Sequence, residues 1–219
     1  MTARAKKPAK SVSREDVLKS ALKHVPFDGF TDSVLERAGK EAGASKDDLA
    51  RLFPEGPIDL VEAFSDWGDD EMEAVLAKKK LASMKIRDRI KTAVWARIEA
   101  LRNDKEAARR AGAFLTLPPH AATGMKLLYR TVDRMWRAAD DTSTDFNFYT
   151  KRAILAGVYS STLMRWFTDQ SEDEVETKAF LDARIENVMQ FEKFKAQVKE
   201  RTKDLPSLSD ILSRFSPRS

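Results

Sequence analysis

The sequence predicts an all-helical protein, and its composition and its residue spacing both support this fold class. Hydrophobic residues make up 42% of the 219-residue chain and charged residues 34%, so a packed core is possible. Only eight glycines and eight prolines interrupt the chain, and the stretches between them are rich in residues that favour helices. Apolar residues recur at three- and four-residue spacing, and we find neither extended strand-like alternation nor an internal repeat.

The first part of the chain predicts a disordered basic tail over residues 1–13 and a unit of three short helices over residues 14–56. Ser13, Thr31 and Ser45 each precede an amphipathic pattern, and serine and threonine are favoured helix caps. Glycine and proline residues between the patterns predict turns. We expect helices over residues 14–25, 31–39 and 46–53.

The central part, residues 57–200, predicts a body of longer helices. Its periodicity is clearest where Ile86, Ile90, Val94 and Ile98 repeat along one helical face. A glycine at position 68 is expected to kink the first of these helices. We expect helices near residues 58–80, 84–102, 105–117, 121–139, 148–168 and 173–200.

The last part, residues 201–219, predicts a linker and an amphipathic helix. One side of this helix is apolar, and it requires a surface that covers it, either a membrane or the chain's own body. Lysine and arginine residues just before the helix favour attraction to anionic lipid. The residues expected to contact the membrane are Leu205, Leu208, Ile211, Leu212 and Phe215.

Charge and composition exclude several classes of protein. The net charge is +4, and residues 1–14 contain five basic residues and no acidic one, so the remaining chain is nearly neutral and shows no broad nucleic-acid footprint. The absence of cysteine excludes disulfides, thiolate metal sites and a cysteine nucleophile. No apolar run is long enough to span a bilayer, and the N-terminus lacks the pattern of a secretory signal.

No catalytic or metal-binding constellation is visible in the sequence. His24 and His120 are far apart and lack the partners of known zinc motifs. Phosphate-binding glycine loops are also absent, and the many carboxylates are spread along helices beside basic residues. We therefore expect a protein that is not an enzyme, with no catalytic residues, no metal and no cofactor.

The helical unit at residues 34–53 resembles the DNA-binding end of TetR-type repressors, because two short helices flank a glycine-containing turn. A recognition helix has to donate hydrogen bonds to phosphates and bases. Here its start carries Asp47 and Asp48, which repel a polyanion. A helical scaffold is therefore favoured over specific nucleic-acid binding.

Apolar residues at 114–168 predict either an ordinary core, which the pattern alone favours, or an adaptable cavity. The opposite side of the helix at 148–168 carries small residues and is suited to close packing against another helix or a second subunit. The candidate cavity residues are Met125, Leu127, Leu128, Trp136, Ile154, Leu155, Val158, Tyr159 and Met164.

Three segments resemble one family: Leu117-Pro-Pro-His120, the stretch from Leu128 to Trp136, and the block from Asp141 to Leu155 that contains Ser-Thr-Asp-Phe-Asn-Phe-Tyr-Thr-Lys-Arg-Ala. They are similar to coenzyme Q biosynthesis protein nine. The resemblance implies a homodimer with a TetR-like fold, a body at residues 57–200 that binds isoprenoid lipids or ubiquinone intermediates, and a C-terminal helix that docks on membranes. It further implies that the protein presents the intermediate to the di-iron demethoxyubiquinone hydroxylase, where that enzyme is present.

By the same resemblance, the surface that contacts this partner comprises Asp133, Met135, Trp136, Asp145, Phe148 and Tyr149. This chain looks like a bacterial member of the family, and we expect it in the cytoplasm, peripheral to the inner membrane. A ligand-responsive transcriptional repressor of the TetR type is the alternative that the helix-turn-helix pattern and the basic tail leave open.

Overall fold

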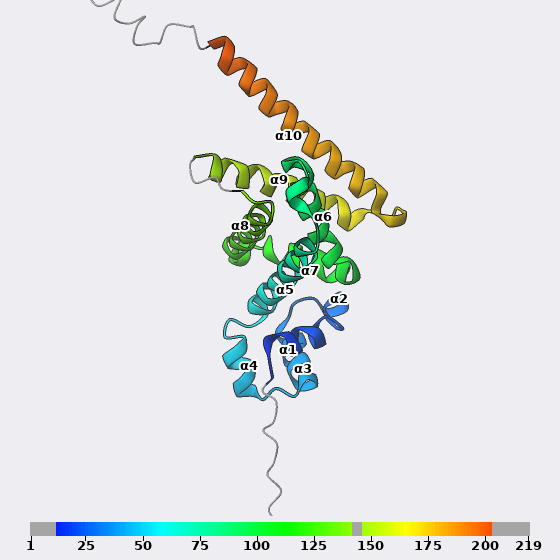
Figure 1. The fold of residues 1–219 in the computed structure, drawn as a ribbon. Helices are drawn as coiled ribbons and strands as arrows, with labels where there is room; N and C mark the ends of the chain where they lie inside the picture. Colours follow the sequence, from blue (N-terminus) through cyan, green and yellow to red (C-terminus); the bar gives the residue numbers. More distant parts are fainter. Residues whose placement is uncertain (1–11, 142–145, 203–219) are drawn as a thin grey trace, which may run out of the picture.

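The structure is a computed structural model that describes residues 12–141 and 146–202 of the chain (Figure 1). Within these ranges helices are the only regular elements, which confirms the predicted all-helical class. Four 3-10 turns, η1 to η4, cover Leu81–Ser83, Arg102–Asp104, Pro118–His120 and Glu172–Glu174. The α-helices are α1 (Arg14–Ala21), α2 (Val25–Asp28), α3 (Asp32–Ala42), α4 (Lys46–Leu52), α5 (Pro57–Ala77), α6 (Ile86–Ala100), α7 (Lys105–Leu115), α8 (Ala121–Ala138), α9 (Phe146–Thr168) and α10 (Val175–Thr202).

The N-terminal helices begin at the residues that the sequence marks as caps. Ser13 and Ser45 each form a capping box with the acidic residue three positions later, and the Thr31 side chain accepts a hydrogen bond from the Val34 amide. Gly43 ends α3 with a left-handed φ of 80°, a conformation that glycine adopts without strain. The turn between α3 and α4 therefore follows the predicted helix-turn-helix pattern.

The first predicted helix is shorter than expected. Residues 14–25 do not form one helix, because α1 ends at Ala21 and a second short helix, α2, begins at Val25. Pro26 explains the break, since it lacks the amide hydrogen that a continuous helix would use and its ring clashes with the preceding turn. The predicted second helix also differs at its end, as α3 continues to Ala42.

Helix α5 is the central support of the molecule and packs against α1, α6 and α8. It runs continuously through Gly68 to Ala77. Leu60 and Met72 are fully buried on its core side. On its other side Arg134 of α8 donates hydrogen bonds to Asp70 at 2.5 Å and to Glu73 at 2.6 and 2.7 Å, so charge pairs also connect α5 to α8.

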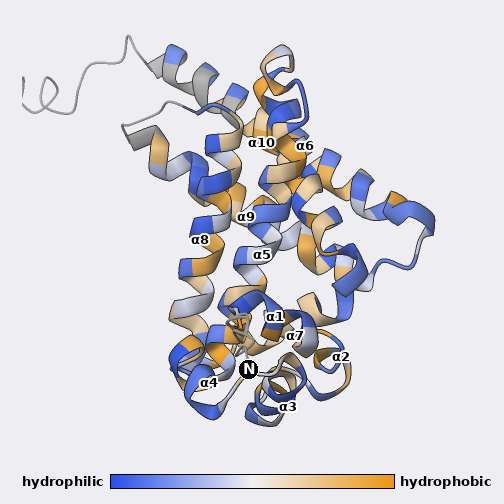
Figure 2. Ribbon diagram, turned by 60° about the horizontal axis from the view of Figure 1, so that its bottom comes forward, coloured by the Kyte–Doolittle hydropathy of each residue, from blue (hydrophilic) through white to orange (hydrophobic). Residues whose placement is uncertain are grey.

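Helices α9 and α10 complete the body. Trp166 of α9 is fully buried and Leu181 of α10 is 1% exposed, and α10 packs on both α9 and α6. The far half of α10 extends beyond the other helices (Figure 1). Most helices carry both hydrophobic and hydrophilic residues, as expected of amphipathic helices around a shared core (Figure 2).

Among the described residues, no helix is both long enough and apolar enough to cross a membrane. The predicted amphipathic helix, with Leu205, Leu208, Ile211, Leu212 and Phe215, lies outside the described residues. The same holds for most of the predicted basic tail and for Asp145.

Candidate functional site

A cavity of about 820 Å³ lies among α5, α6, α7, α8 and α9. Helix α7 contributes small side chains to its wall, including Ala108, Ala111 and Gly112, which leave room between the helices. The cavity is lined by Val61, Phe64, Ser65, Arg97, Leu101, Ala108, Arg109, Ala111, Gly112, Ala113, Leu115, Thr116, Ala121, Gly124, Met125, Leu127, Leu128, Thr131, Tyr159, Ser160, Leu163, Met164, Phe167 and Thr168. A predominantly apolar wall with a few polar groups is typical of small-molecule sites.

The two ends of the cavity differ in exposure. Met125 on α8 and Met164 on α9 are 66% and 67% exposed, so they mark the side that opens to solvent. Methionine side chains are flexible and adapt to ligands of different shape. Leu127 and Tyr159 are buried and mark the inner side.

The inner end carries a buried polar cluster around Asp69, which is fully buried on α5. Arg97 of α6 donates from Nε to Asp69 Oδ1 at 2.7 Å and from Nη2 to the Ser65 carbonyl at 3.2 Å. The Thr131 hydroxyl lies 2.9 and 3.0 Å from the two carboxylate oxygens of Asp69 and donates to this carboxylate. The cluster therefore connects α5, α6 and α8 at the cavity wall.

Tyr159 of α9 reaches the same inner end. Burial raises the pKa of its phenol above the ordinary value. The hydroxyl is therefore protonated at neutral pH and can donate a hydrogen bond. Arg97 also lies close to Gly68, where an added Cβ would be 2.4 Å from Nη1, so only glycine leaves space for the guanidinium.

The cavity includes some of the residues predicted to bind lipid and omits others. Met125, Leu127, Leu128, Tyr159 and Met164 line it. Four predicted members are absent from its described wall, namely Trp136, Ile154, Leu155 and Val158. Leu155 and Val158 are instead buried in the core.

Sequence reasoning missed the contribution of α6 and α7 to this cavity. No sequence motif distinguishes Arg97 from the other charged residues of its helix. Its burial depends on the ion pair with Asp69, which is 28 positions away in the sequence. The signal for α7 was its cluster of small residues, Ala107, Ala108, Ala111, Gly112 and Ala113.

The residues predicted to contact a protein partner gather where α8 faces the start of α9. Tyr149 is 65% exposed and its ring lies edge-on to Phe148, with 5.1 Å between ring centroids. Trp136 is half-buried and donates from Nε1 to the Lys151 carbonyl at 3.2 Å. Met135 is fully buried, so it does not belong to an exposed surface. Its position in the amphipathic repeat of α8 turns it toward the core.

Arg152 fixes this region, although it is only 3% exposed. It donates from Nε to Asp133 at 2.7 Å and from Nη1 to Asp141 at 3.3 Å. Its guanidinium also lies 3.3 Å from the centroid of the Phe148 ring, in the geometry of a cation–π contact. These contacts hold the beginning of α9 against α8 and set the orientation of the two aromatic rings.

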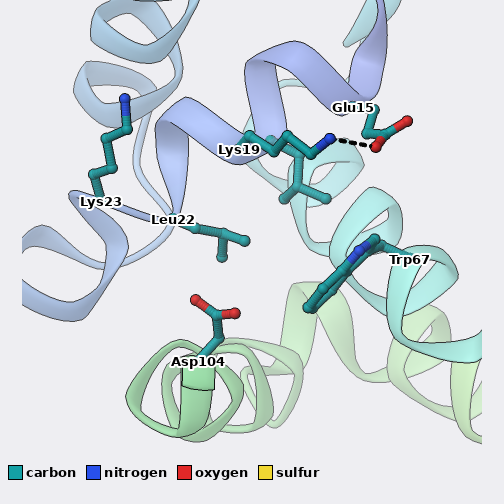
Figure 3. Close-up of a pocket in the computed structure, with 7 residues that line it drawn as sticks. Glu15, Lys19, Leu22, Lys23, Trp67 and Asp104 are labelled. Atoms are coloured by element: carbon teal, nitrogen blue, oxygen red, sulfur yellow. Dashed lines mark ion pairs between the residues drawn. The ribbon is translucent and has the colours of Figure 1, made fainter. Parts of the chain in front are cut away.

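A second, smaller cavity of about 310 Å³ lies between α1, α5 and η2 (Figure 3). Figure 3 shows Trp67 on one side and Leu22 with Asp104 on the other, with Lys19 turned toward Glu15. Lys19 forms an ion pair with Glu15 at 2.6 Å. Burial raises the pKa of Asp104. No residue predicted to bind a ligand lines this cavity among the described residues.

The two histidines have structural partners. His24 Nε2 lies 2.8 Å from Glu41 Oε1. The His120 ring stacks on Phe114 with 4.2 Å between centroids. Over residues 12–141 and 146–202 no group of three histidine or carboxylate side chains is arranged to hold a metal ion.

Comparison with known proteins identifies relatives of this chain. Residues 121–192 match the family model of COQ9. The ubiquinone biosynthesis protein COQ9 of Rattus norvegicus, described as mitochondrial, is 34% identical over 190 residues, which cover 84% of this chain and 61% of the relative. Its counterparts in Bos taurus and Homo sapiens are each 32% identical and cover 84% of this chain and 59% of the relative. The chain thus spans about three fifths of the length of the curated relatives it matches.

A solved structure shows the fold independently. The TetR transcriptional regulator from Nitrosomonas europaea superimposes with a TM-score of 0.61 over 78% of this chain and 95% of the regulator, at 18% sequence identity. The protein therefore has an all-α, TetR-like fold. Because the chain is 34% identical to the COQ9 protein of Rattus norvegicus over 84% of its own length, it belongs to the COQ9 family.

Proposed function

We propose that this chain acts in ubiquinone biosynthesis by holding an isoprenoid or quinone intermediate in the cavity between α5 and α9. It serves as a binding protein rather than as an enzyme, and it presents the intermediate to a membrane-associated hydroxylase. The single observation that carries the proposal is the cavity of about 820 Å³ with its largely apolar wall. Its volume lies within the range of about 300–1,000 Å³ that ligand sites typically have.

The wall chemistry favours a long apolar ligand. Leu115, Leu128, Leu163 and Phe167 offer hydrocarbon surface along the cavity. Burying an apolar chain there is favourable by about 25 cal/mol for each Å² removed from water. The names of the relatives place them in ubiquinone biosynthesis. The intermediates of this route carry isoprenoid chains. Such apolar chains are suited to the apolar wall of the cavity.

Docking on a membrane is the second part of the proposal. Isoprenoid intermediates reside in lipid, so a carrier has to reach the bilayer surface. Residues 205–215 supply an amphipathic pattern for this contact, and Lys193, Lys199 and Lys203 precede it. An apolar face of this size with adjacent basic residues supports reversible binding to anionic membranes. The proposed location is the cytoplasmic side of the inner membrane.

The hydroxylase partner is proposed to bind where α8 meets α9. Tyr149 offers an exposed aromatic ring, and Trp136, Phe148 and Asp133 surround it at partly buried positions. Aromatic anchors rimmed by charged residues are common in protein interfaces. The Arg152 contacts described above keep this surface rigid, which lowers the entropy that binding has to overcome.

A homodimer is proposed through the outer side of α9. Ala153 and Gly157 are exposed there. Small residues permit a neighbouring helix to approach closely, so this side of α9 is suited to a second copy of the chain.

Specific DNA binding receives no support beyond the fold. Helix α4 begins with Asp47 exposed, and Asp48 is engaged as the capping partner of Ser45 and in an ion pair with Arg51 at 3.0 Å. The carboxylates at this helix start disfavour approach to phosphates. The transcriptional alternative therefore has no specific observation in its favour.

Native mass spectrometry of the purified full chain tests the proposal. We expect bound isoprenoid lipid or quinone in the wild-type protein and its loss in Gly112→Phe, because the new ring occupies the cavity. An added Cβ at Gly112 meets Phe167 at 3.5 Å, an ordinary contact, so the helix itself tolerates a side chain.

The control is Ala74→Phe, which adds the same ring at an exposed position of α5, outside the cavity wall and outside the proposed dimer surface, and should leave lipid binding unchanged. Urea denaturation of both variants shows whether they are folded. A wild-type protein that carries no lipid and takes up none from vesicles would contradict the proposed function.

A further inference from the structure

The inner end of the cavity contains polar groups that an apolar chain alone does not need. Arg97, Thr131 and Tyr159 line the wall there, and they are only 4%, 2% and 4% exposed. Burial of a guanidinium is costly unless it is paired and hydrogen-bonded, and aliphatic side chains would avoid that cost. These groups therefore point to a ligand with a polar end.

Two hydrogen-bond donors at this end have no acceptor among the described residues. Nε and Nη2 of Arg97 are engaged by Asp69 and Ser65, whereas the buried Nη1 has no hydrogen-bond partner among the described residues. No hydrogen bond to a described residue engages the Tyr159 hydroxyl either. A buried donor without an acceptor costs about 1–3 kcal/mol, so an acceptor oxygen brought by a ligand is favoured at this position.

The charge at this end indicates which oxygen fits. Asp69 already balances Arg97, and it is also 4.0 Å from Nη1 of Arg134, whose other contacts are with Asp70 and Glu73. Arg109, near the solvent side of the wall, is paired with Glu106 at 2.7 and 2.8 Å. A phosphate or carboxylate would therefore bring unbalanced negative charge into a buried site, whereas a carbonyl or phenolic oxygen would not.

We infer that Arg97 and Tyr159 form a head-group site for a neutral, oxygen-bearing ring. A carbonyl or phenolic oxygen of the ring accepts hydrogen bonds from Arg97 Nη1 and from the Tyr159 hydroxyl. The apolar chain of the ligand then follows the wall toward Met125 and Met164, where the cavity opens. This inference rests on the proposed function and adds which end of the ligand enters first and what chemistry recognises it.

Tyr159→Phe is the variant that tests the site, because it keeps the buried ring and removes only a hydroxyl that no described residue binds. Isothermal titration of the full chain would compare decyl-benzoquinone with decylbenzene, which has the same chain and no oxygen. We expect wild type to prefer the quinone and Tyr159→Phe to weaken quinone binding about three- to tenfold, the effect of one hydrogen bond. Affinity for decylbenzene should not change.

Tyr129→Phe is the matched control, since Tyr129 is 45% exposed and lies outside the described cavity wall. It should change neither affinity. Equal losses for both compounds in Tyr159→Phe, or no loss for the quinone, would overturn the head-group site while leaving the carrier function intact. Tighter binding of decyl phosphate than of the quinone would overturn the neutral head group. If wild type binds none of the three compounds, the proposed function fails as well.

Discussion

At the residue scale, Asp69 joins three helices through its side chain. It is fully buried, and both of its oxygens accept hydrogen bonds from neighbours on α6 or α8. A buried carboxylate is tolerated only when its charge is compensated and its lone pairs are used. Asp69 satisfies both conditions through Arg97 and Thr131. The position of the cavity's inner wall thus depends on the ion pair between Asp69 and Arg97. This pair in turn requires glycine at position 68, because a larger residue would collide with the guanidinium.

Gly68→Ala should lower the free energy of unfolding by about 1–3 kcal/mol, the usual cost of overpacking a core. The added Cβ would lie 2.4 Å from Nη1 and 2.7 Å from Cζ of Arg97, so the guanidinium has to move away from Asp69. Urea denaturation measures the effect.

Gly157→Ala is the control, because a Cβ there has no neighbour within 4 Å. At an exposed helical position this change should raise the free energy of unfolding by about 0.5–1 kcal/mol. Equal effects of the two substitutions would show that Arg97 has room to relax.

At the scale of elements, the start of α10 is set by a single carboxylate. Asp169 accepts hydrogen bonds from the amide and hydroxyl of Ser171, both at Oδ1, and from the amide and hydroxyl of Thr177, both at Oδ2. Burial favours the neutral acid, but these four hydrogen bonds outweigh it and hold the pKa of Asp169 well below its ordinary value. The charged form of Asp169 therefore fixes the turn between α9 and α10.

Asp169→Ala should lower the free energy of unfolding at pH 7 by about 1–3 kcal/mol, because amide donors at the start of α10 lose their acceptor. A depressed carboxyl pKa stabilises the fold above the unfolded value of about 3.9, and this contribution is lost as the pH falls further. The difference between variant and wild type should thus shrink below pH 4. Urea denaturation across this range measures it, and Glu172→Ala, exposed in the same turn, should show no such dependence.

Most of the helices could be predicted from sequence because their signals are local. Ser13, Thr31 and Ser45 mark helix starts through their own side chains, and periodic apolar residues mark the buried sides. The break before Val25 was missed because the apolar repeat continued through Leu22 to Val25, directly before Pro26. At the site, Leu127 and Leu128 followed from periodicity, whereas Arg97 did not, because its role depends on contacts between distant segments.

At the scale of the whole molecule, one long helix, α10, extends from the helical body. Helix α10 has 28 residues, which at 1.5 Å per residue gives a length of about 42 Å. Its first half packs on α6 and α9, and its far half extends past the body (Figure 1). The C-terminal end of α10 therefore lies away from the N-terminal helices (Figure 1).

Deletion of residues 205–219 should abolish flotation of the protein with vesicles that contain phosphatidylglycerol. The apolar side of the predicted helix supplies the buried area, so Leu208→Asp should reduce flotation strongly. Ser209→Asp adds the same charge on the polar side and should reduce it only slightly. Flotation that persists after the deletion would show that another surface contacts the lipid.

The unpartnered Nη1 of Arg97 has a thermodynamic consequence for the protein as a whole. Nη1 of Arg97 is a buried donor with no hydrogen-bond partner among the described residues, and such a donor is costly to leave without an acceptor. The proposed ligand would bind the folded state and not the unfolded chain, so its binding and folding would be linked. The melting temperature then rises with the logarithm of free ligand concentration, and the loaded form becomes the one that resists unfolding and proteolysis.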